Sequence, residues 1–404
     1  MDLEIRTVEQ HEWDGLLRMM SLAFGENVDP TEAAAARKVT EFDRTIAAYD
    51  DGAMVGSGSI ASLEISVPGG TAPVAGVTSI GVLPTHRRRG VMTAVLRRQF
   101  EDVHEGREAV ACLYASEGAI YQRFGYGMGV PMAAFNIDRR RTAFVRSHQP
   151  RGEIHLLQPA EAMDAVRDIY ERGRTRWPGM LDRPGGWWEY RLQHQHDRES
   201  FTEWFFAVHQ ADELDGYAIY RVKQGWSHQG PNLELELEEL MALDEDAYAA
   251  LWRFCFDTDL VGRIYGWKRP VDDPILHMLA EPRALRFHVR DGLWVRLVDV
   301  DTALETRRYS AEDRLVFEVH DDNCPWNEGR FELEGGPDGA SCRRTDAKAD
   351  LIVDAVDLGA TYMGGVAFQT LAGARRVMEA SPGALKRADA MFTWRPGPWC
   401  AHVI

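Results

Sequence analysis

The segment that decides the fold is VTSIGVLPTHRRRGVMTAVLRRQF, residues 77–100. An apolar run typical of a strand leads directly into the sequence HRRRG and then into a helix whose apolar side chains share one face. The first N–H groups of a helix have no partner within the helix, and the helix dipole places partial positive charge there. Arginine adds bidentate donors, and Gly90 allows close approach of the backbone. This segment therefore predicts a cradle for phosphate.

The same basic run has a simpler interpretation, because most short basic runs are exposed loops that pair with surface acids. Its position between a strand and a helix favours the phosphate cradle. This stretch contains neither GxGxxG nor GxxxxGK[ST], so a nicotinamide cofactor and a nucleoside triphosphate are not favoured.

The segments around this cradle predict an α+β domain over residues 1–150. Helical spacing and turn residues indicate, in chain order, two helices, three strands in an antiparallel meander, a helix and a buried strand. The segments are 11–24 and 32–39, then 44–50, 54–67 and 73–84, then 87–106, and finally 108–116.

A similar succession begins again after residue 150 without close sequence repetition, and it predicts a second domain over residues 151–290. Its last long strand leads into Asp244, Glu245 and Asp246 rather than into arginines. These acids would repel a pyrophosphate, so we expect the equivalent site there to be lost. Residues 291–404 predict a separate α+β domain that ends in two helical stretches, 372–380 and 383–392.

Composition excludes several classes of function. The 404 residues carry 46 Lys+Arg against 63 Asp+Glu, a net charge of −17, which repels nucleic acid and anionic membrane and favours a cationic substrate. No apolar stretch approaches the about 18 residues of a membrane span, and the N-terminus lacks the pattern of a secretory leader, so we expect a cytoplasmic protein. The five cysteines are widely spaced without CxxC, and His194 and His196 lack an evident third ligand. We therefore expect no disulfide framework and no metal.

Two motifs carry a resemblance to a known family. The first is RRRGVM at residues 87–92, which resembles the acetyl-CoA motif [RQ]xxGx[GA] of the GCN5-related N-acetyltransferase (GNAT) superfamily, with Met92 in place of a small residue. The second is ASEGAIYQRFGYG at residues 115–127. With DGLW at 291–294 and a chain end at Ile404, they make the sequence similar, over nearly its whole length, to the enhanced intracellular survival (Eis) family of aminoglycoside acetyltransferases.

The resemblance implies an α+β fold of tandem GNAT domains, each with a mixed, mostly antiparallel, splayed sheet and flanking helices. A C-terminal sterol-carrier-protein-like domain follows, and the subunits commonly assemble as a hexamer. The implied co-substrate is acetyl-CoA and the implied acceptor is a polycationic amine. The residues implied to bind the cofactor are Ile80, Gly81, Val82, Arg87, Arg88, Arg89, Gly90, Val91, Met92, Thr93, Ser116 and Glu117.

The resemblance also implies catalytic and acceptor residues. Tyr121 matches the general acid, the terminal carboxylate of Ile404 matches the general base, and Phe24 and Glu26 match acceptor contacts. The backbone N–H of Val82 is our candidate oxyanion donor.

Each of these assignments has an alternative. Tyr121 could be a packing residue and Glu26 a solvated acid, and His402 could act as the base. The chain could instead be a lysine, peptide or polyamine acetyltransferase, or a non-catalytic protein whose last domain binds an apolar ligand or serves as a scaffold.

Overall fold

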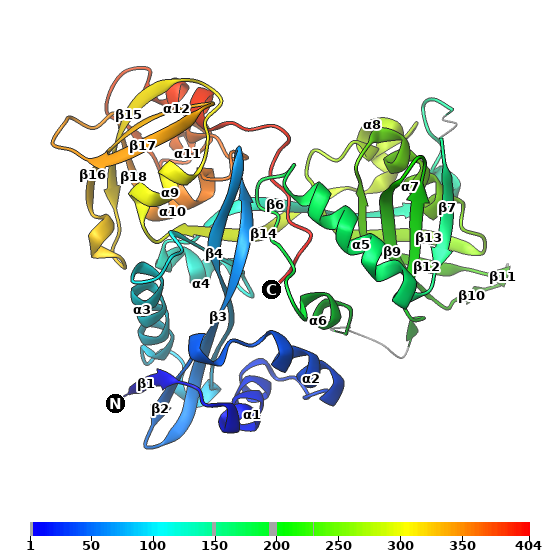
Figure 1. The fold of residues 1–404 in the computed structure, drawn as a ribbon, viewed down its shortest axis with the longest axis horizontal. Helices are drawn as coiled ribbons and strands as arrows, with labels where there is room; N and C mark the ends of the chain where they lie inside the picture. Colours follow the sequence, from blue (N-terminus) through cyan, green and yellow to red (C-terminus); the bar gives the residue numbers. More distant parts are fainter. Residues whose placement is uncertain (1–2, 148–150, 194–199, 229) are drawn as a thin grey trace.

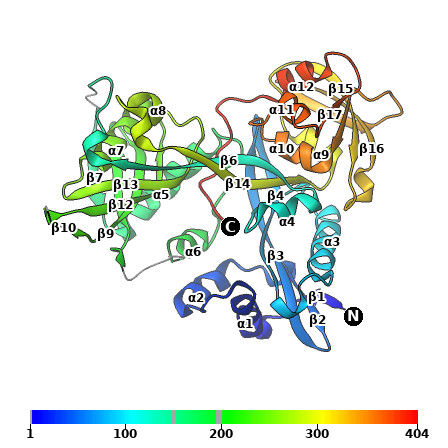
Figure 2. The same ribbon diagram turned by 180° about the vertical axis from the view of Figure 1, so that it is seen from behind.

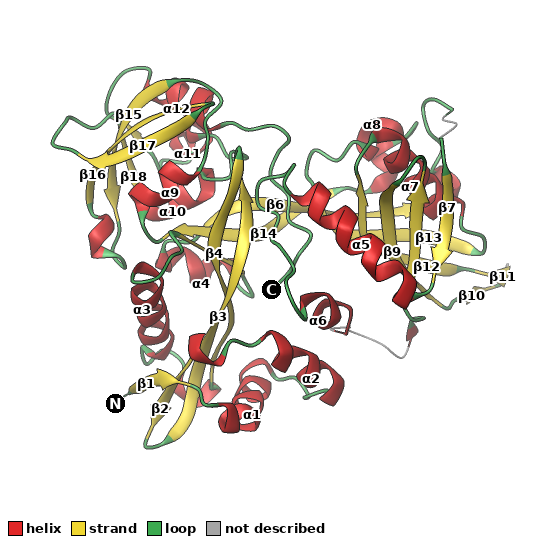
Figure 3. Ribbon diagram, viewed as in Figure 1, coloured by secondary structure: helices red, strands yellow, loops and turns green. Residues whose placement is uncertain are grey.

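The computed structural model describes residues 3–147, 151–193, 200–228 and 230–404. A single sheet of twelve strands runs through the elements from β1 to β14, and a five-stranded sheet lies in the last part of the chain (Figure 1). We call the elements β1–β6 the first domain, β7–β14 the second and α9–α12 the third. Their strands and helices are distinguished by colour in Figure 3.

In the first domain the expected meander is confirmed, because β2, β3 and β4 are consecutive antiparallel strands. The expected helix after residue 90 forms as α3 and buries its apolar face, including Val95, Leu96 and Phe100. Asp29 caps α2 by accepting hydrogen bonds from the backbone of its first turn. The elements are β1 (Glu4–Thr7), α1 (Trp13–Phe24), α2 (Pro30–Val39), β2 (Thr45–Asp50), β3 (Ala53–Val67), β4 (Gly70–Val82), α3 (Val91–His104), β5 (Val110–Tyr114), α4 (Gly118–Tyr121) and β6 (Gly127–Asp138).

The second domain repeats this order in outline. Strands β8, β9 and β12 are antiparallel neighbours, and helix α7 connects β12 to the parallel strand β13. The elements are β7 (Glu153–Leu157), α5 (Pro159–Arg174), α6 (Trp187–Gln193), β8 (Phe205–Gln210), β9 (Leu214–Lys223), β10 (Trp226–Ser227), β11 (Gly230–Pro231), β12 (Leu233–Ala242), α7 (Glu245–Asp257), β13 (Val261–Arg269), α8 (Ile275–Met278) and β14 (His288–Leu297).

The first two domains exchange strands. β14 leaves the second domain and lies between β5 and β6, where Leu293 pairs with Tyr114 on one side and Val130 on the other. β6 in turn continues beyond β14 and pairs antiparallel with β13. Residue 290, where we expected the second domain to end, lies inside β14, so the sheet is continuous across that position.

The third domain has strand order β17-β16-β15-β18-β19 with helices against the sheet (Figure 3). The expected helix over 383–392 forms as α12, but the helix expected over 372–380 is wrong. Helix α11 ends at Gly373, Arg375 adopts a left-handed φ of 62°, and β19 pairs with β18. Pairing with a strand distant in sequence outweighs the local preference of small and charged residues for helix. The elements are α9 (Val300–Thr306), β15 (Asp313–His320), β16 (Gly329–Gly336), β17 (Gly339–Arg344), β18 (Leu351–Asp354), α10 (Ala355–Thr361), α11 (Phe368–Gly373), β19 (Met378–Glu379) and α12 (Ala384–Phe392).

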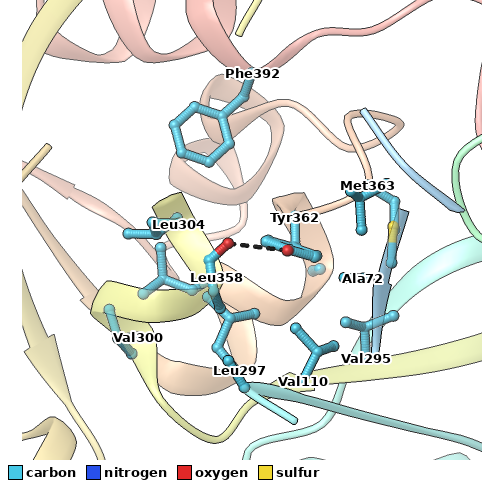
Figure 4. Close-up of a cluster of buried hydrophobic side chains, with 14 of the residues drawn as sticks. Ala72, Val110, Val295, Leu297, Val300, Leu304, Leu358, Tyr362, Met363 and Phe392 are labelled. Carbon is cyan, nitrogen blue, oxygen red and sulfur yellow. Dashed lines mark hydrogen bonds between the residues drawn. The ribbon is translucent and has the colours of Figure 1, made fainter. Parts of the chain in front are cut away.

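One hydrophobic cluster joins the third domain to the large sheet (Figure 4). Ala72, Val110 and Val295 from the sheet pack in the same cluster as Leu358 and Phe392 of the third domain. Burial of each large apolar side chain contributes about 1.5–3 kcal/mol, so this contact holds the two bodies together.

A buried ion pair makes a second connection between the sheet and the third domain. Arg296 on β14 donates from Nη2 to both carboxylate oxygens of Asp321 at 2.8 Å, and both side chains are buried. Gly125 leaves room for this guanidinium, since a Cβ there would lie 1.4 Å from Arg296 Nη1.

We predict that Gly125→Ala lowers the free energy of unfolding by about 3 kcal/mol or more, because displacing Arg296 removes the cationic partner of the buried Asp321. Gly52→Ala is the matched control. Gly52 has a similar φ of 77° against 79° at Gly125, but no described atom lies within 4 Å of its added Cβ. Gly52→Ala should lower the free energy of unfolding by only about 1–2 kcal/mol, because an alanine is strained at this left-handed φ. Urea unfolding of both variants makes the comparison, and equal losses would contradict the role given to Arg296.

Candidate active site

The site forms where two parallel strands separate. β4 and β5 pair over Val74–Gly76 and Val110–Cys112, and in the described chain this pairing ends there. The register between β3 and β4 also shifts just beyond this point, and Ser79 takes a left-handed φ of 54°. The bulge and the separation together open the sheet between β4 and β5, as the sequence led us to expect.

Two pockets meet at this opening, and Phe24 lines both. We call the first the arginine pocket, of about 740 Å³. Its lining residues are Ala23, Phe24, Ile80, Gly81, Val82, His86, Arg87, Arg88, Gly90, Val91, Met92, Thr93, Ser116, Glu117, Ile120, Tyr121, Arg123 and Phe124. We call the second the acidic pocket, which is formed by α1, α2, α6, the bulged parts of β3 and β4, and Ile404.

The start of α3 gives the arginine pocket its affinity for anions. Gly90 occupies the N-cap position with φ 86°, and no described side chain caps this helix. The first N–H groups of α3 are therefore free to bind a ligand. A Cβ added at Gly90 would meet no described atom within 4 Å, so the space beside the turn is open.

The expected cofactor-binding residues line this pocket except for Arg89, which is exposed and lies outside the lining. Two of them also have structural contacts. The Arg87 guanidinium donates to the carbonyl of Ala23 at 2.6 Å, which ties the end of α1 to the loop. Gly81 lets α1 pack on β4, because a Cβ there would lie 2.8 Å from Met20 Sδ.

The backbone of β4 presents a donor to the opening. Leu83 N–H donates to Val55 O of β3 at 2.9 Å. Successive N–H groups of a strand point to opposite edges, so the N–H of Val82 points away from β3, toward the edge that β5 has left. This direction suits the oxyanion donor that we expect at Val82.

Tyr121 closes the arginine pocket from α4. Its side chain is buried and lies edge-on to Tyr126, with ring centroids 6.2 Å apart. Burial raises the pKa of the Tyr121 phenol above its ordinary value of 10, and a hydrogen bond with the Ser116 side chain partly offsets this. The phenol therefore stays protonated at neutral pH and can donate a proton.

The acidic pocket combines carboxylates with aromatic rings. Among the described residues that line it there is no Lys, Arg or His. The carboxylates are Glu26, Asp29, Glu32 and Glu41, and the aromatic residues are Trp13, Phe24, Trp187 and Tyr190. Negative charge and aromatic faces both attract cations.

The last residue of the chain lies in this pocket. Ile404 is among its lining residues, and its Cδ1 would be 2.9 Å from a Cβ added at Gly76, where β4 and β5 separate. Figures 1 and 2 show the chain end between β3, β4 and α6 from opposite sides. The terminal residue thus reaches the opening between the strands.

His402, the alternative base, has a different environment. It is buried outside both pockets, with Nδ1 2.9 Å from the carbonyl of Asp182 and its ring edge-on to Trp187. Burial lowers the pKa of His402 well below 6.5, and nearby arginines lower it further.

The expected absence of a metal site concerns residues that lie partly outside the described chain. His194 and His196 belong to the segment that the structure does not describe. Within the described ranges, His, Cys, Asp and Glu form no group of three or more that could hold a metal ion. The helices of the described chain also include none long and apolar enough to cross a membrane.

Comparison with known proteins follows the same three-part division. Family models of the acetyltransferase (GNAT) domain match residues 4–129 and 179–297, and that of the sterol carrier protein domain matches 300–401. An uncharacterised N-acetyltransferase of Streptomyces avermitilis is 40% identical over 410 residues, covering 100% of both chains. N-acetyltransferase Eis of Mycobacterium tuberculosis is 34% identical over 414 residues, covering 97% of each. The chain belongs to the Eis family of N-acetyltransferases.

A solved structure agrees with this membership. The crystal structure of Eis1 from Mycobacterium abscessus superimposes with a TM-score of 0.88 at 34% identity, covering 99% of this chain and 100% of that one. The expected fold class, tandem GNAT domains with a sterol-carrier-like domain, is confirmed. The chain is an acetyltransferase, and its GNAT fold implies the use of acetyl-CoA.

The arginine pocket fits that cofactor, since it offers an uncapped helix N-terminus, Arg88 and open space beside Gly90 to a pyrophosphate. Sequence reasoning missed most of the acidic pocket. Trp187 and Tyr190 come from the second domain, and Glu32 stands alone in an alanine-rich helix, so no local motif marks them.

We predict that Arg88→Gln raises the Kd for acetyl-CoA about tenfold, because it removes one charge-assisted contact with phosphate. Arg89→Gln is the matched control from the same basic run and should change the Kd by less than about twofold. Titration calorimetry measures both. An equal rise in Kd in both variants would mean that net charge, rather than the geometry of the cradle, holds the cofactor.

Proposed function

We propose that this protein transfers the acetyl group of acetyl-CoA to one or more amines of a polycationic acceptor such as an aminoglycoside. The observation that carries the proposal is the acidic pocket, which adjoins the arginine pocket and has four carboxylate side chains and no described basic residue in its lining. The name Eis on the relatives supports the same reaction class.

The charge of the acidic pocket favours amines over neutral acceptors. At an effective dielectric constant of about 20, one charge pair at 4 Å is worth about 4 kcal/mol, so several carboxylates discriminate strongly. Phe24, exposed by 46% where the two pockets meet, can pack against the apolar body of an acceptor while Glu26 attracts its ammonium groups.

Acetyl-CoA, when bound, supplies an activated acetyl group as a thioester. In our proposal the terminal carboxylate of Ile404 takes a proton from the acceptor nitrogen as the new C–N bond forms. The N–H of Val82 stabilises negative charge on the carbonyl oxygen, and Tyr121 O–H gives a proton to the departing sulfur.

The energetics of the Tyr121 step are modest. A phenol with a pKa of about 10 protonates a thiolate with a conjugate pKa of about 8.5 at a cost of roughly 2 kcal/mol. Burial raises the pKa of Tyr121 further, and the hydrogen bond with Ser116 counteracts this.

The position of the chain end supports the carboxylate as base. Ile404 lines the acidic pocket, whereas His402 is buried outside it with Nδ1 beside a backbone carbonyl. A base must reach the proton that it removes, which favours Ile404.

The cytoplasmic location and the hexamer are proposals that rest on the family resemblance and on composition. The interior of the third domain bears on the alternative of an apolar-ligand carrier. The buried Arg307 guanidinium donates to Tyr362 O and Phe392 O and lies beside the ring of Tyr309. A buried charged group in this domain disfavours an apolar ligand beside it.

The substrate class is tested by following thiol release from acetyl-CoA with matched acceptors: an aminoglycoside, a linear polyamine, a lysine peptide and a neutral amino sugar. We expect kcat/KM to rise with the number of positive charges and to be at least about a hundredfold higher for the aminoglycoside than for the neutral sugar, equivalent to roughly 2.7 kcal/mol. Added salt should reduce the ratio of kcat/KM between the aminoglycoside and the neutral sugar, because salt screens charge interactions. A higher kcat/KM with the peptide or the polyamine would contradict the proposed aminoglycoside-like acceptor. No turnover with any amine would support the scaffold alternative.

We predict that Tyr121→Phe lowers kcat by about a hundredfold, typical for loss of a general acid, while the Kd for acetyl-CoA changes by less than about threefold. The phenyl ring keeps the packing against Tyr126, so the variant should fold. In the wild type, kcat should show no loss from phenol ionisation up to about pH 10, because burial raises the pKa of Tyr121. Parallel losses in kcat and in cofactor affinity would make Tyr121 a packing residue.

A further inference from the structure

The second GNAT domain has the same strand separation as the first. β12 and β13 pair in parallel up to Leu237 and Gly266, and the register between β12 and β9 shifts at Glu238. In the first domain the corresponding opening, between β4 and β5, leads to the arginine pocket. The second domain therefore has a second opening of the kind that receives a cofactor.

Side chains of its own strands cross this second opening. Lys268 Nζ on β13 donates to Glu238 on β12 at 2.6 Å, and Arg269 Nη1 donates to the carbonyl of Leu240 on β12 at 2.8 Å. These four residues lie beyond Leu237 and Gly266, the last paired residues of the two strands. The side chains of Lys268, Arg269 and Glu238 are at most 10% exposed. The opening is closed by charged groups.

The helix that follows β12 also differs from α3. Asp244 caps α7 by accepting from Ala247 N–H at 2.8 Å, whereas Gly90 leaves the start of α3 uncapped. The anion-binding end of α7 thus already holds a carboxylate of the chain. A capping carboxylate disfavours a pyrophosphate at this helix end, which agrees with our expectation from Asp244–Asp246.

Trp399 from the C-terminal segment fills what is left of the opening. Its indole N–H donates to the carbonyl of Lys268 at 2.5 Å, and the Arg269 guanidinium lies 5.3 Å from the centre of its ring. Trp177 packs edge-on to it at 5.1 Å, and only 2% of Trp399 is exposed.

From Trp399 the chain runs directly to the first domain. The backbone N–H of Trp399 donates to Pro178 O at 2.9 Å, and three residues later His402 contacts Asp182 O. The segment between these two carbonyls also pairs with β3, through an N–H of Asp182 that donates to Glu64 O at 2.9 Å. Tyr114 O–H of β5 also donates to Cys400 O at 3.5 Å, so the C-terminal segment contacts both domains between Trp399 and His402.

The distance from this anchor to the chain end is short. Ile404 lies five positions after Trp399, and an extended chain of that length spans at most about 18 Å. Ile404 reaches the acidic pocket within this span. Trp399 is the contact that holds this short segment in the second opening, and its loss would let the residues that lead to Ile404 shift.

We propose that the vestigial cofactor opening of the second domain is a socket for Trp399, and that this socket sets the position of the terminal carboxylate in the acidic pocket of the first. Trp399 is a positioning residue, and its role rests on the proposed function of that carboxylate as base. The second domain thereby contributes to catalysis without binding a cofactor of its own.

The test is a double-mutant cycle between Trp399→Ala and a two-glycine extension after Ile404, which moves the carboxylate away. We expect Trp399→Ala to lower kcat at least about tenfold with the Kd for acetyl-CoA unchanged within about twofold. In the extended protein the same substitution should lower the residual kcat by less than about twofold, because the carboxylate is already displaced. Trp399→Phe, which keeps the ring and loses one hydrogen bond, should retain activity within about threefold of the wild type.

Trp226→Ala is the matched control, since Trp226 lies in the second domain, which forms the socket, with 79% of its surface exposed. This variant should leave kcat unchanged. The affinity for acetyl-CoA reports whether each variant is folded. Should Trp399→Ala not fold, Trp399→Leu takes its place in the cycle, with the same expected pattern.

The outcomes separate this inference from the function on which it rests. An extension that leaves kcat unchanged refutes the terminal carboxylate as base and with it the proposed mechanism. An extension that disables the enzyme, with full activity in Trp399→Ala or equal losses in both backgrounds, refutes the socket alone.

Discussion

The whole site depends on a parallel strand pair that stops early. β4 and β5 remain together for three residues on each strand and then separate, while β14 continues the sheet on the far side of β5. Backbone groups on the inner edges of the gap are left without the partners that a sheet normally supplies. Val82 N–H is such a group, and the start of α3, Tyr121 and the chain end all converge on the same gap. The reactive groups therefore gather at a local interruption of the strand pairing.

The two GNAT domains share a separated pair of parallel strands, but the gap is open in the first domain and filled in the second. In the first, small residues such as Gly81 and Gly90 surround the gap and the helix end is left open. In the second, ion pairs and an indole ring occupy the gap, and Asp244 caps the helix. A buried charge is costly unless it is paired, and in the second gap Glu238 is paired with both Lys268 and Arg191.

The parts that could be predicted from sequence are those that are contiguous in it. The strand, turn and helix over 77–100 formed as expected because periodicity and glycine placement encode them locally. The orientation of single arginines could not be predicted. Arg88 lines the pocket and Arg89 does not, and this depends on a left-handed φ of 62° at Arg88. Long-range pairings were also invisible, including the strand β19 within an expected helix and the aromatic wall that α6 adds to the acidic pocket.

The insertion of β14 between β5 and β6 has a consequence for biosynthesis. The first domain cannot complete its sheet until β14, which begins at His288, has been made, whereas β6 already ends at Asp138. During translation the first domain therefore waits with one edge of β5 and both edges of β6 unpaired, and such edges are sites for mispairing. Its folding is coupled to the arrival of the later half, so the enzyme matures as a unit near the end of synthesis rather than domain by domain.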